Sequence, residues 1–205
     1  MLRRLSLRTS RIEAFSDGVF SIVCTLLVLD LGVPHLQGLN ASLELSALLV
    51  KLGPKIFCYI MSFCIIIIYW VAHYHLFHII KKSDRGLLWL NSLFLMVLAF
   101  IPFPTALVGE YPNEPLAVML FAGVMAMAGV CFTLMRWYVS LVGKLIDPGI
   151  DRALIKRSML RSLANPVLYT TAIILAPYNT RASLVLCAAI PVLYFFPGKL
   201  EKNSS

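Results

Sequence analysis

Long stretches without a charged residue constrain this chain more than any other feature. Residues 57–72 and 116–135 each run without an acidic or basic side chain, and a helix needs about 20 such residues to cross a bilayer. Across the 205 residues, 60% are hydrophobic and only 14% are charged. One soluble core of this size has no need for so much apolar surface. The sequence therefore predicts an all-α integral membrane protein.

Charged residues and the proline- and glycine-containing breaks divide the chain into six expected transmembrane helices. They fall at about residues 12–33, 54–80, 87–109, 115–141, 158–177 and 181–197, and together they make residues 1–205 a single six-helix transmembrane domain. Residues 43–51 are expected to form either a short helix at the membrane surface or an extension of the second helix. Pro102 and Pro104 are expected to loosen the third helix.

The basic residues predict the orientation of these helices. One side receives most of them: Arg3, Arg4, Arg8, Arg11, Lys81, Lys82, Arg85, Lys144, Arg152, Lys156, Arg157, Arg161, Lys199 and Lys202. The other side receives only Lys51, Lys55 and Arg181. Because short cytoplasmic loops are rich in lysine and arginine, both termini are expected in the cytoplasm.

The net charge of +8 does not indicate a nucleic-acid-binding protein, because the basic residues lie in short connecting segments and no soluble domain presents them on one face. The five cysteines are scattered through apolar stretches, without the paired spacing of a disulfide framework or a zinc site. We therefore expect the bilayer, and no nucleic acid, as a partner.

The first helix differs from the others, because polar residues are spread along an otherwise apolar span. At 100° per residue, Ile22, Leu26 and Leu29 share one stripe, with Thr25 on its edge. Arg11 and Phe15 also fall on this face. Ser16 and Asp17 point in other directions. Spacing alone leaves open whether the stripe only packs against other helices.

An ionisable residue within a span is costly and usually faces protein or water with a partner. Asp17 is such a residue, unless it simply lies near the cytoplasmic interface. The partners available at comparable depth are Arg11, Trp70, His73 and Asn91.

The histidines of the second helix raise the question of a metal. His73 and His75 point about 200° apart, so only His75 and His78 share a face, and no carboxylate cluster accompanies them. We expect no metal and no cofactor. Phosphate-binding, nucleophile-elbow and zinc-protease motifs are absent, so we also expect no enzymatic activity.

The segment from Arg11 to Asp17, RIEAFSD, resembles the RxxxFSD signature of the transmembrane protein 175 family of potassium channels. Arg11, Phe15, Ser16 and Asp17 all match it. Trp70 with His73, and Asn91 with the PFPT run at 102–105, are also similar to the family.

The resemblance implies a potassium-selective, leak-type channel: a homotetramer whose first helices line a central pore. It implies a constriction of apolar rings in place of a carbonyl filter, formed by Ile22, Leu26 and Leu29 with Thr25 as a hydroxyl ring. The pore helix would be anchored by Arg11, Phe15, Ser16, Asp17, Trp70, His73 and Asn91.

The resemblance further implies potassium as the permeant ion and, since no second six-helix repeat is present, the inner membrane of a bacterial cell. Two other classes remain open. A proton- or cation-coupled secondary transporter would use Asp17, Glu13 or His73 as its carrier site, and a membrane scaffold would use the polar residues only to assemble helices.

Overall fold

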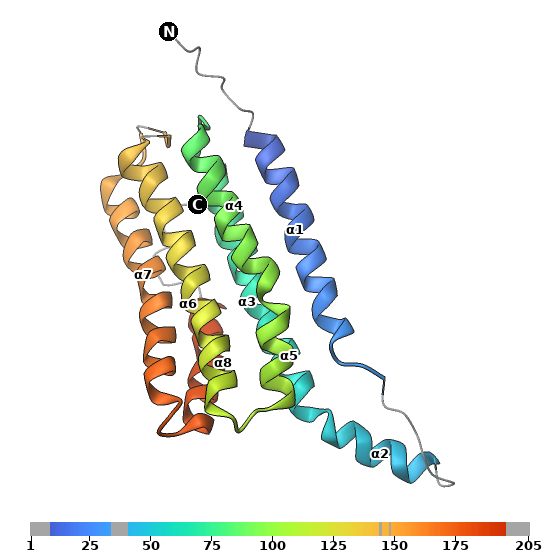
Figure 1. The fold of residues 1–205 in the computed structure, drawn as a ribbon. Helices are drawn as coiled ribbons and strands as arrows, with labels where there is room; N and C mark the ends of the chain where they lie inside the picture. Colours follow the sequence, from blue (N-terminus) through green and yellow to red (C-terminus); the bar gives the residue numbers. More distant parts are fainter. Residues whose placement is uncertain (1–8, 34–40, 144, 148, 196–205) are drawn as a thin grey trace.

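In a computed structural model, the described residues, 9–33, 41–143, 145–147 and 149–195, form a bundle of α-helices (Figure 1). The helices are α1 (Thr9–Leu29), α2 (Ala41–Lys51), α3 (Gly53–His78), α4 (Arg85–Phe100), α5 (Pro102–Glu110), α6 (Pro115–Trp137), α7 (Arg152–Leu175) and α8 (Thr180–Phe195), with a π-helical turn at Tyr138–Val142. The prediction of an all-α membrane protein is confirmed. The terminal basic residues used for the orientation, Arg3, Arg4, Arg8, Lys199 and Lys202, lie outside the described residues, as does Lys144.

Four helical segments in the described chain are long and apolar enough to cross a membrane: Thr9–Leu29, Gly53–His78, Arg85–Glu110 and Pro115–Val142. The predicted fifth and sixth spans do not reach this standard. α7 carries basic residues through its first turns, and α8 has only 16 residues.

Local chemistry explains where the helix ends differ from the predicted ones. α1 ends at Leu29 instead of residue 33, because Gly32 adopts a φ of +62°, which a helix cannot continue. α7 begins at Arg152 instead of residue 158, because the Asp151 carboxylate accepts a hydrogen bond from the Ala153 N–H (2.9 Å) and caps the helix.

The predicted third helix, 87–109, consists of α4 and α5, which meet at Ile101. Pro102 has no N–H to donate to the preceding turn, and the Ile101 N–H instead bonds to the Leu98 carbonyl (3.0 Å). The predicted fourth helix, 115–141, is α6 followed by the π-helical turn. Residues 43–51 belong to α2, which is a separate short helix that projects from the bundle at the end where α1 finishes (Figure 1).

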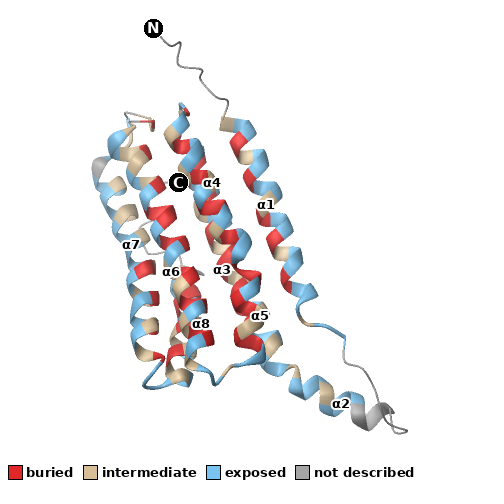
Figure 2. Cartoon of the chain, in the orientation of Figure 1, coloured by how far each residue is buried: buried red, intermediate tan, exposed pale blue. Residues whose placement is uncertain are grey.

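α6 is the most buried of the four apolar segments and α1 the least (Figure 2). α6 packs closely against α7 because Gly129 has no side chain. A Cβ there would lie 2.5 Å from Asn165 Oδ1 and 3.0 Å from Pro166 Cδ. α1 stands at the edge of the bundle, where it packs mainly against α3 and α4 (Figure 1).

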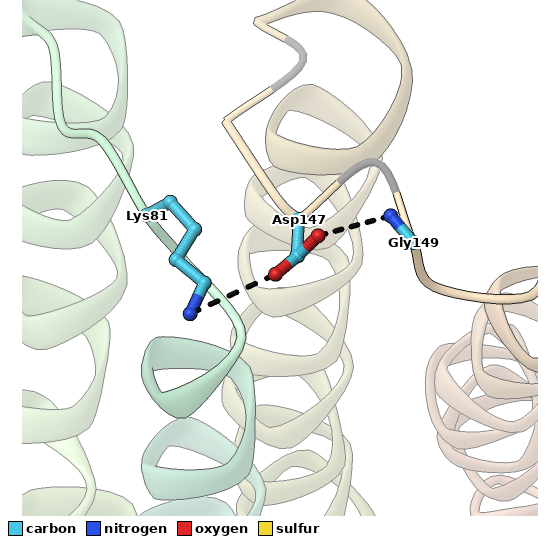
Figure 3. Close-up of polar contacts among 3 residues, drawn as sticks. All are labelled: Lys81, Asp147 and Gly149. Atoms are coloured by element: carbon cyan, nitrogen blue, oxygen red, sulfur yellow. Dashed lines mark hydrogen bonds and ion pairs between the residues drawn. The ribbon is translucent and has the colours of Figure 1, made fainter.

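The α3–α4 connection pairs with the α6–α7 connection at the end of the bundle where α1 begins. The Lys81 N–H donates to the Leu145 carbonyl (2.9 Å), and Ile80 pairs with Ile146 as an antiparallel bridge. Asp147 then accepts a hydrogen bond from the Gly149 N–H (2.9 Å), and its carboxylate lies 3.7 Å from the Lys81 ammonium (Figure 3). Since both side chains of this ion pair are largely exposed, the backbone pairing contributes more to the connection.

Candidate functional site

α1 has one face packed on its own chain and another that this chain leaves uncovered. The packed residues recur every three or four positions: Ile12, Ser16, Phe20, Val23 and Leu27. This spacing makes one helical stripe, and all five side chains are almost fully buried.

A buried chain of hydrogen bonds joins α1 to α4 and α3. Asn91 Nδ2 donates to Ser16 Oγ (3.0 Å), and Ser16 Oγ donates to the Ile12 carbonyl (2.8 Å). On the other side, Asn91 Oδ1 lies 2.9 Å from His73 Nε2. Because a carboxamide oxygen only accepts, His73 satisfies this contact by carrying its hydrogen on Nε2.

Aromatic rings surround the histidine of this chain. The His73 ring stacks on Phe77, with centroids 4.3 Å apart, and meets the edge of Phe20 at 5.7 Å. Ser16, His73 and Asn91 are each at most 2% exposed. Each of these three side chains is hydrogen-bonded. Their burial places the bonds in a low-dielectric environment, where a missing partner is costly.

Asp17 makes a separate contact on a different side of α1. Its Oδ1 accepts a hydrogen bond from Trp70 Nε1 (2.9 Å), which joins α1 to α3 a second time. Both side chains are exposed on the single chain. Of the four partners considered from the sequence, Trp70 is the one that bonds to Asp17.

The uncovered face of α1 carries the stripe of residues 22, 26 and 29. Ile22 is 59% exposed, Leu26 41% and Leu29 72%. Thr25 is also exposed, and its hydroxyl donates to the Ile22 carbonyl (2.8 Å). The hydroxyl hydrogen is thus used within the helix, which leaves the oxygen lone pairs directed away from it.

Arg11 and Phe15 lie on this uncovered side and not in the buried polar chain. Phe15 is 64% exposed, and both residues line a surface cavity of about 330 Å³ beside Trp89. No hydrogen bond or ion pair joins Arg11 to another residue in the described part of the chain.

Several polar contacts of the bundle were not predicted from the sequence, and two of them join α3 to α5. Ser62 and Thr105 share a buried hydrogen bond (2.8 Å) between α3 and α5, and Lys55 forms an ion pair with Glu110 at the ends of the same helices. The sequence does contain a signal for the first contact, because Ser62 and Thr105 are each a single polar residue within an apolar stretch. Among the described residues, no three His, Cys, Asp or Glu side chains gather as a metal site would require.

Comparison with known proteins places these features in a family. Residues 11–102, which contain all but the first two residues of α1, the whole of α2 to α4 and every residue of the buried chain, match the family model described as the endosomal/lysosomal potassium channel TMEM175. A potassium channel of Streptomyces collinus is 37% identical over 85% of this chain and 87% of its own length.

A potassium channel of Chamaesiphon minutus is 31% identical over 91% of this chain and 93% of its own length. The crystal structure of a lysosomal potassium-selective channel TMEM175 homologue from that organism superimposes with a TM-score of 0.82 at 30% identity. It covers 96% of this chain and 98% of the other. The signature at residues 11–17, the helical fold and this similarity over nearly the whole length agree, and the chain belongs to the TMEM175 family.

Proposed function

We propose that this protein is a potassium-selective, leak-type channel in which four copies of the chain place their α1 helices around a central pore. The observation that carries the proposal is the uncovered apolar stripe of α1, which lies on a helix held to its own chain by buried polar bonds. Lipid alone could cover such a stripe. Its position within the segment that matches a family of potassium channels favours a pore.

In this proposal Ile22, Leu26 and Leu29 form successive rings of apolar side chains. A ring narrow enough to remove part of the hydration shell favours potassium over sodium, because sodium holds its water more tightly. The same ring stops conduction when it closes far enough to lose its water.

Thr25 supplies the one hydroxyl ring within the constriction. Its hydrogen bond to the Ile22 carbonyl keeps the hydrogen away from the axis, so the oxygen is free to face a partly hydrated cation. Ser16, Asp17, Trp70, His73 and Asn91 hold α1 in position and do not bind the permeant ion. Arg11 and Phe15 act at the cytoplasmic start of the same helix, towards neighbouring copies.

The proposed topology has six spans with both termini in the cytoplasm. It follows from the basic residues of the α3–α4 and α6–α7 connections, which lie at the end of the bundle where α1 begins. α7 and α8 cross as the fifth and sixth spans, and the basic first turns of α7 lie at the cytoplasmic end. The bacterial relatives favour the cell membrane as the location.

Reversal potentials in planar bilayers, with potassium on one side and sodium on the other, test the filter. The Ile22→Ser variant is expected to lower potassium-over-sodium selectivity at least about tenfold, because a small polar ring lets hydrated sodium pass. Val28→Ser is the matched control. Val28 is also exposed (46%), but it lies about 120° around α1 from the stripe.

An unchanged reversal potential in Ile22→Ser, with Val28→Ser also unchanged, would contradict the filter role. The same recordings separate the channel from a coupled transporter. A channel gives resolved single-channel current steps, whereas a transporter gives slow, saturable flux that depends on a proton gradient.

A further inference from the structure

A second polar cavity lies away from α1, between α3, α6, α7 and α8. Its volume is about 490 Å³, within the range of small-molecule sites. Two arginines line it, Arg136 near the end of α6 and Arg161 in α7. The other polar lining residues include Ser158, Ser162 and Asn165 of α7, and Tyr194 of α8.

The charge in this cavity is unbalanced. Neither Asp nor Glu is among its described lining residues, so no carboxylate there offsets the charge of the two arginines. Two positive charges that line one cavity attract an anion, and an anion there would offset the cost of the partly buried Arg136. The Ser162 hydroxyl and the Asn165 amide group are hydrogen-bond donors that suit the same anion, whereas the Ser158 and Tyr194 hydroxyls already donate to backbone carbonyls.

Both guanidinium groups are positioned by aromatic rings. Arg136 stacks over Phe132, with its central carbon 5.2 Å from the ring centroid, and Arg161 over Tyr194 at 5.5 Å. The Tyr194 hydroxyl also donates to the Arg161 carbonyl (3.0 Å). The ring covers only one face of each guanidinium, and the N–H donors lie at its edge. In Arg161, Nη2 donates to the Tyr194 carbonyl (3.4 Å), and the other N–H groups are left for a ligand.

Arg136 also has an unused donor. Its Nε is buried and has no hydrogen-bond partner among the residues that the structure describes. An arginine that only extends its charge towards water would keep this group hydrated. A buried unpaired N–H is instead what a ligand site contains before the ligand binds.

We propose that this cavity binds a phosphate group through Arg136 and Arg161, with the headgroup of an anionic phospholipid as one source and free phosphate as the other. Guanidinium groups match phosphate because they offer paired, planar N–H donors. The cavity also has an apolar wall of Ile67, Ile68 and Val71 from α3, and Val71 is 40% exposed, so an acyl chain can leave along it. Basic pockets between membrane helices bind anionic headgroups in this manner.

The purified full-length protein tests the proposal by native mass spectrometry with phosphatidylglycerol and by calorimetry with inorganic phosphate. We expect saturable binding of one of the two probes, at one per chain. Arg161→Gln is expected to weaken it about tenfold, since each arginine contributes charge-assisted hydrogen bonds. The double variant Arg136→Gln/Arg161→Gln is expected to weaken it further.

Lys156→Gln is the matched control. It removes one positive charge from the same exposed turns of α7, but it points about 140° away from Arg161 and does not line the cavity. Its affinity for the probe is expected to stay within about twofold of the wild type. Because Arg161 is exposed, Arg161→Gln is expected to fold even if the buried Arg136 proves necessary for stability. Unchanged elution from a sizing column checks this.

The two probes distinguish the sources. Bound phosphatidylglycerol that excess inorganic phosphate does not displace assigns the site to a lipid, whereas binding of inorganic phosphate alone assigns it to the free anion. If neither probe binds, or if Lys156→Gln weakens binding as much as Arg161→Gln does, the proposal is overturned.

Discussion

Asn91 is the residue on which the buried polar chain depends, because it is bonded to both Ser16 and His73. Asn91→Leu keeps most of the side-chain volume but removes both hydrogen bonds, so that His73 Nε2 loses its acceptor and Ser16 keeps only its bond to the Ile12 carbonyl. We expect a loss of about 1 kcal/mol in the free energy of unfolding and a decrease of about 2–4 °C in melting temperature. Thermal unfolding of the purified protein, followed by fluorescence, measures the change.

Ser92→Ala provides the comparison for Asn91→Leu. Ser92 is the next residue on α4, and its exposed hydroxyl bonds only to the Leu88 carbonyl of the same helix (2.9 Å). Its melting temperature should stay close to that of the wild type. Equal melting temperatures for the two variants would count against a role of Asn91 in joining the helices.

Asp17 is expected to position α1 and not to bind the ion. Asp17→Asn keeps an oxygen that accepts the Trp70 N–H but removes the negative charge. We expect the potassium-over-sodium reversal potential to remain unchanged, with the protein eluting as the wild type does from a sizing column. A shifted reversal potential with normal elution would assign the carboxylate to the ion pathway.

The sequence predicted the members of the candidate site better than their pairing. The helical wheel separated Ser16 from Asp17, and in the structure they make different contacts, with Asn91 and with Trp70. The helical wheel could not show which of four residues at similar depth bonds to Asp17, since the choice of Trp70 depends on how α3 is rotated against α1. The placement of Arg11 and Phe15 on the face of Ile22 was already present in the wheel, although the family resemblance grouped them with the anchor.

At the scale of helices, the contact between α6 and α7 depends on Gly129. Gly129→Ala would place a methyl group against Asn165 and the rigid ring of Pro166, and Asn165 is itself held by the Tyr69 hydroxyl (3.2 Å). We expect a loss of about 1–3 kcal/mol in stability, measured as a lower melting temperature.

Gly123→Ala is the control on the same helix, because a Cβ there meets no atom within 4 Å. Its melting temperature should be unchanged or slightly higher, since alanine favours the helix more than glycine does. Equal destabilisation by both substitutions would contradict the role of Gly129 in the packing of α6 on α7.

Hydropathy predicted the apolar helices, while their ends and interruptions followed from single residues. Pro102 and Pro104 indicated the break between α4 and α5 from the sequence alone. The early start of α7 was not predicted, because Arg152, Lys156 and Arg157 give this segment the polarity of a loop. The Asp151 carboxylate nevertheless caps a helix that begins there. The π-helical turn after α6 has no recognised signal in the sequence.

At the scale of the whole molecule, the proposed tetramer predicts the protein mass of the particle in detergent. Light scattering that subtracts the detergent is expected to give about four times the chain mass of 22.9 kDa.

Leu29→Cys, at the uncovered end of α1, should form disulfide-linked dimers on oxidation if the α1 helices of neighbouring copies converge there. Leu116→Cys, which is similarly exposed (76%) but begins α6, is the control and should remain monomeric on a denaturing gel.

The hydrogen-bond chain from Ser16 through Asn91 to His73 has one more consequence, for the height of α1 along the membrane normal. Apolar contacts between helices in lipid have little preference for one axial position over another, because the lipid tails are equally apolar. A shift of α1 by one residue would move Ser16 about 1.5 Å along the axis and 100° around it, and would break its bond to Asn91, which His73 holds in place from α3. In a symmetric assembly every copy would therefore hold its Ile22 at the same level, so that separate side chains form one coplanar ring.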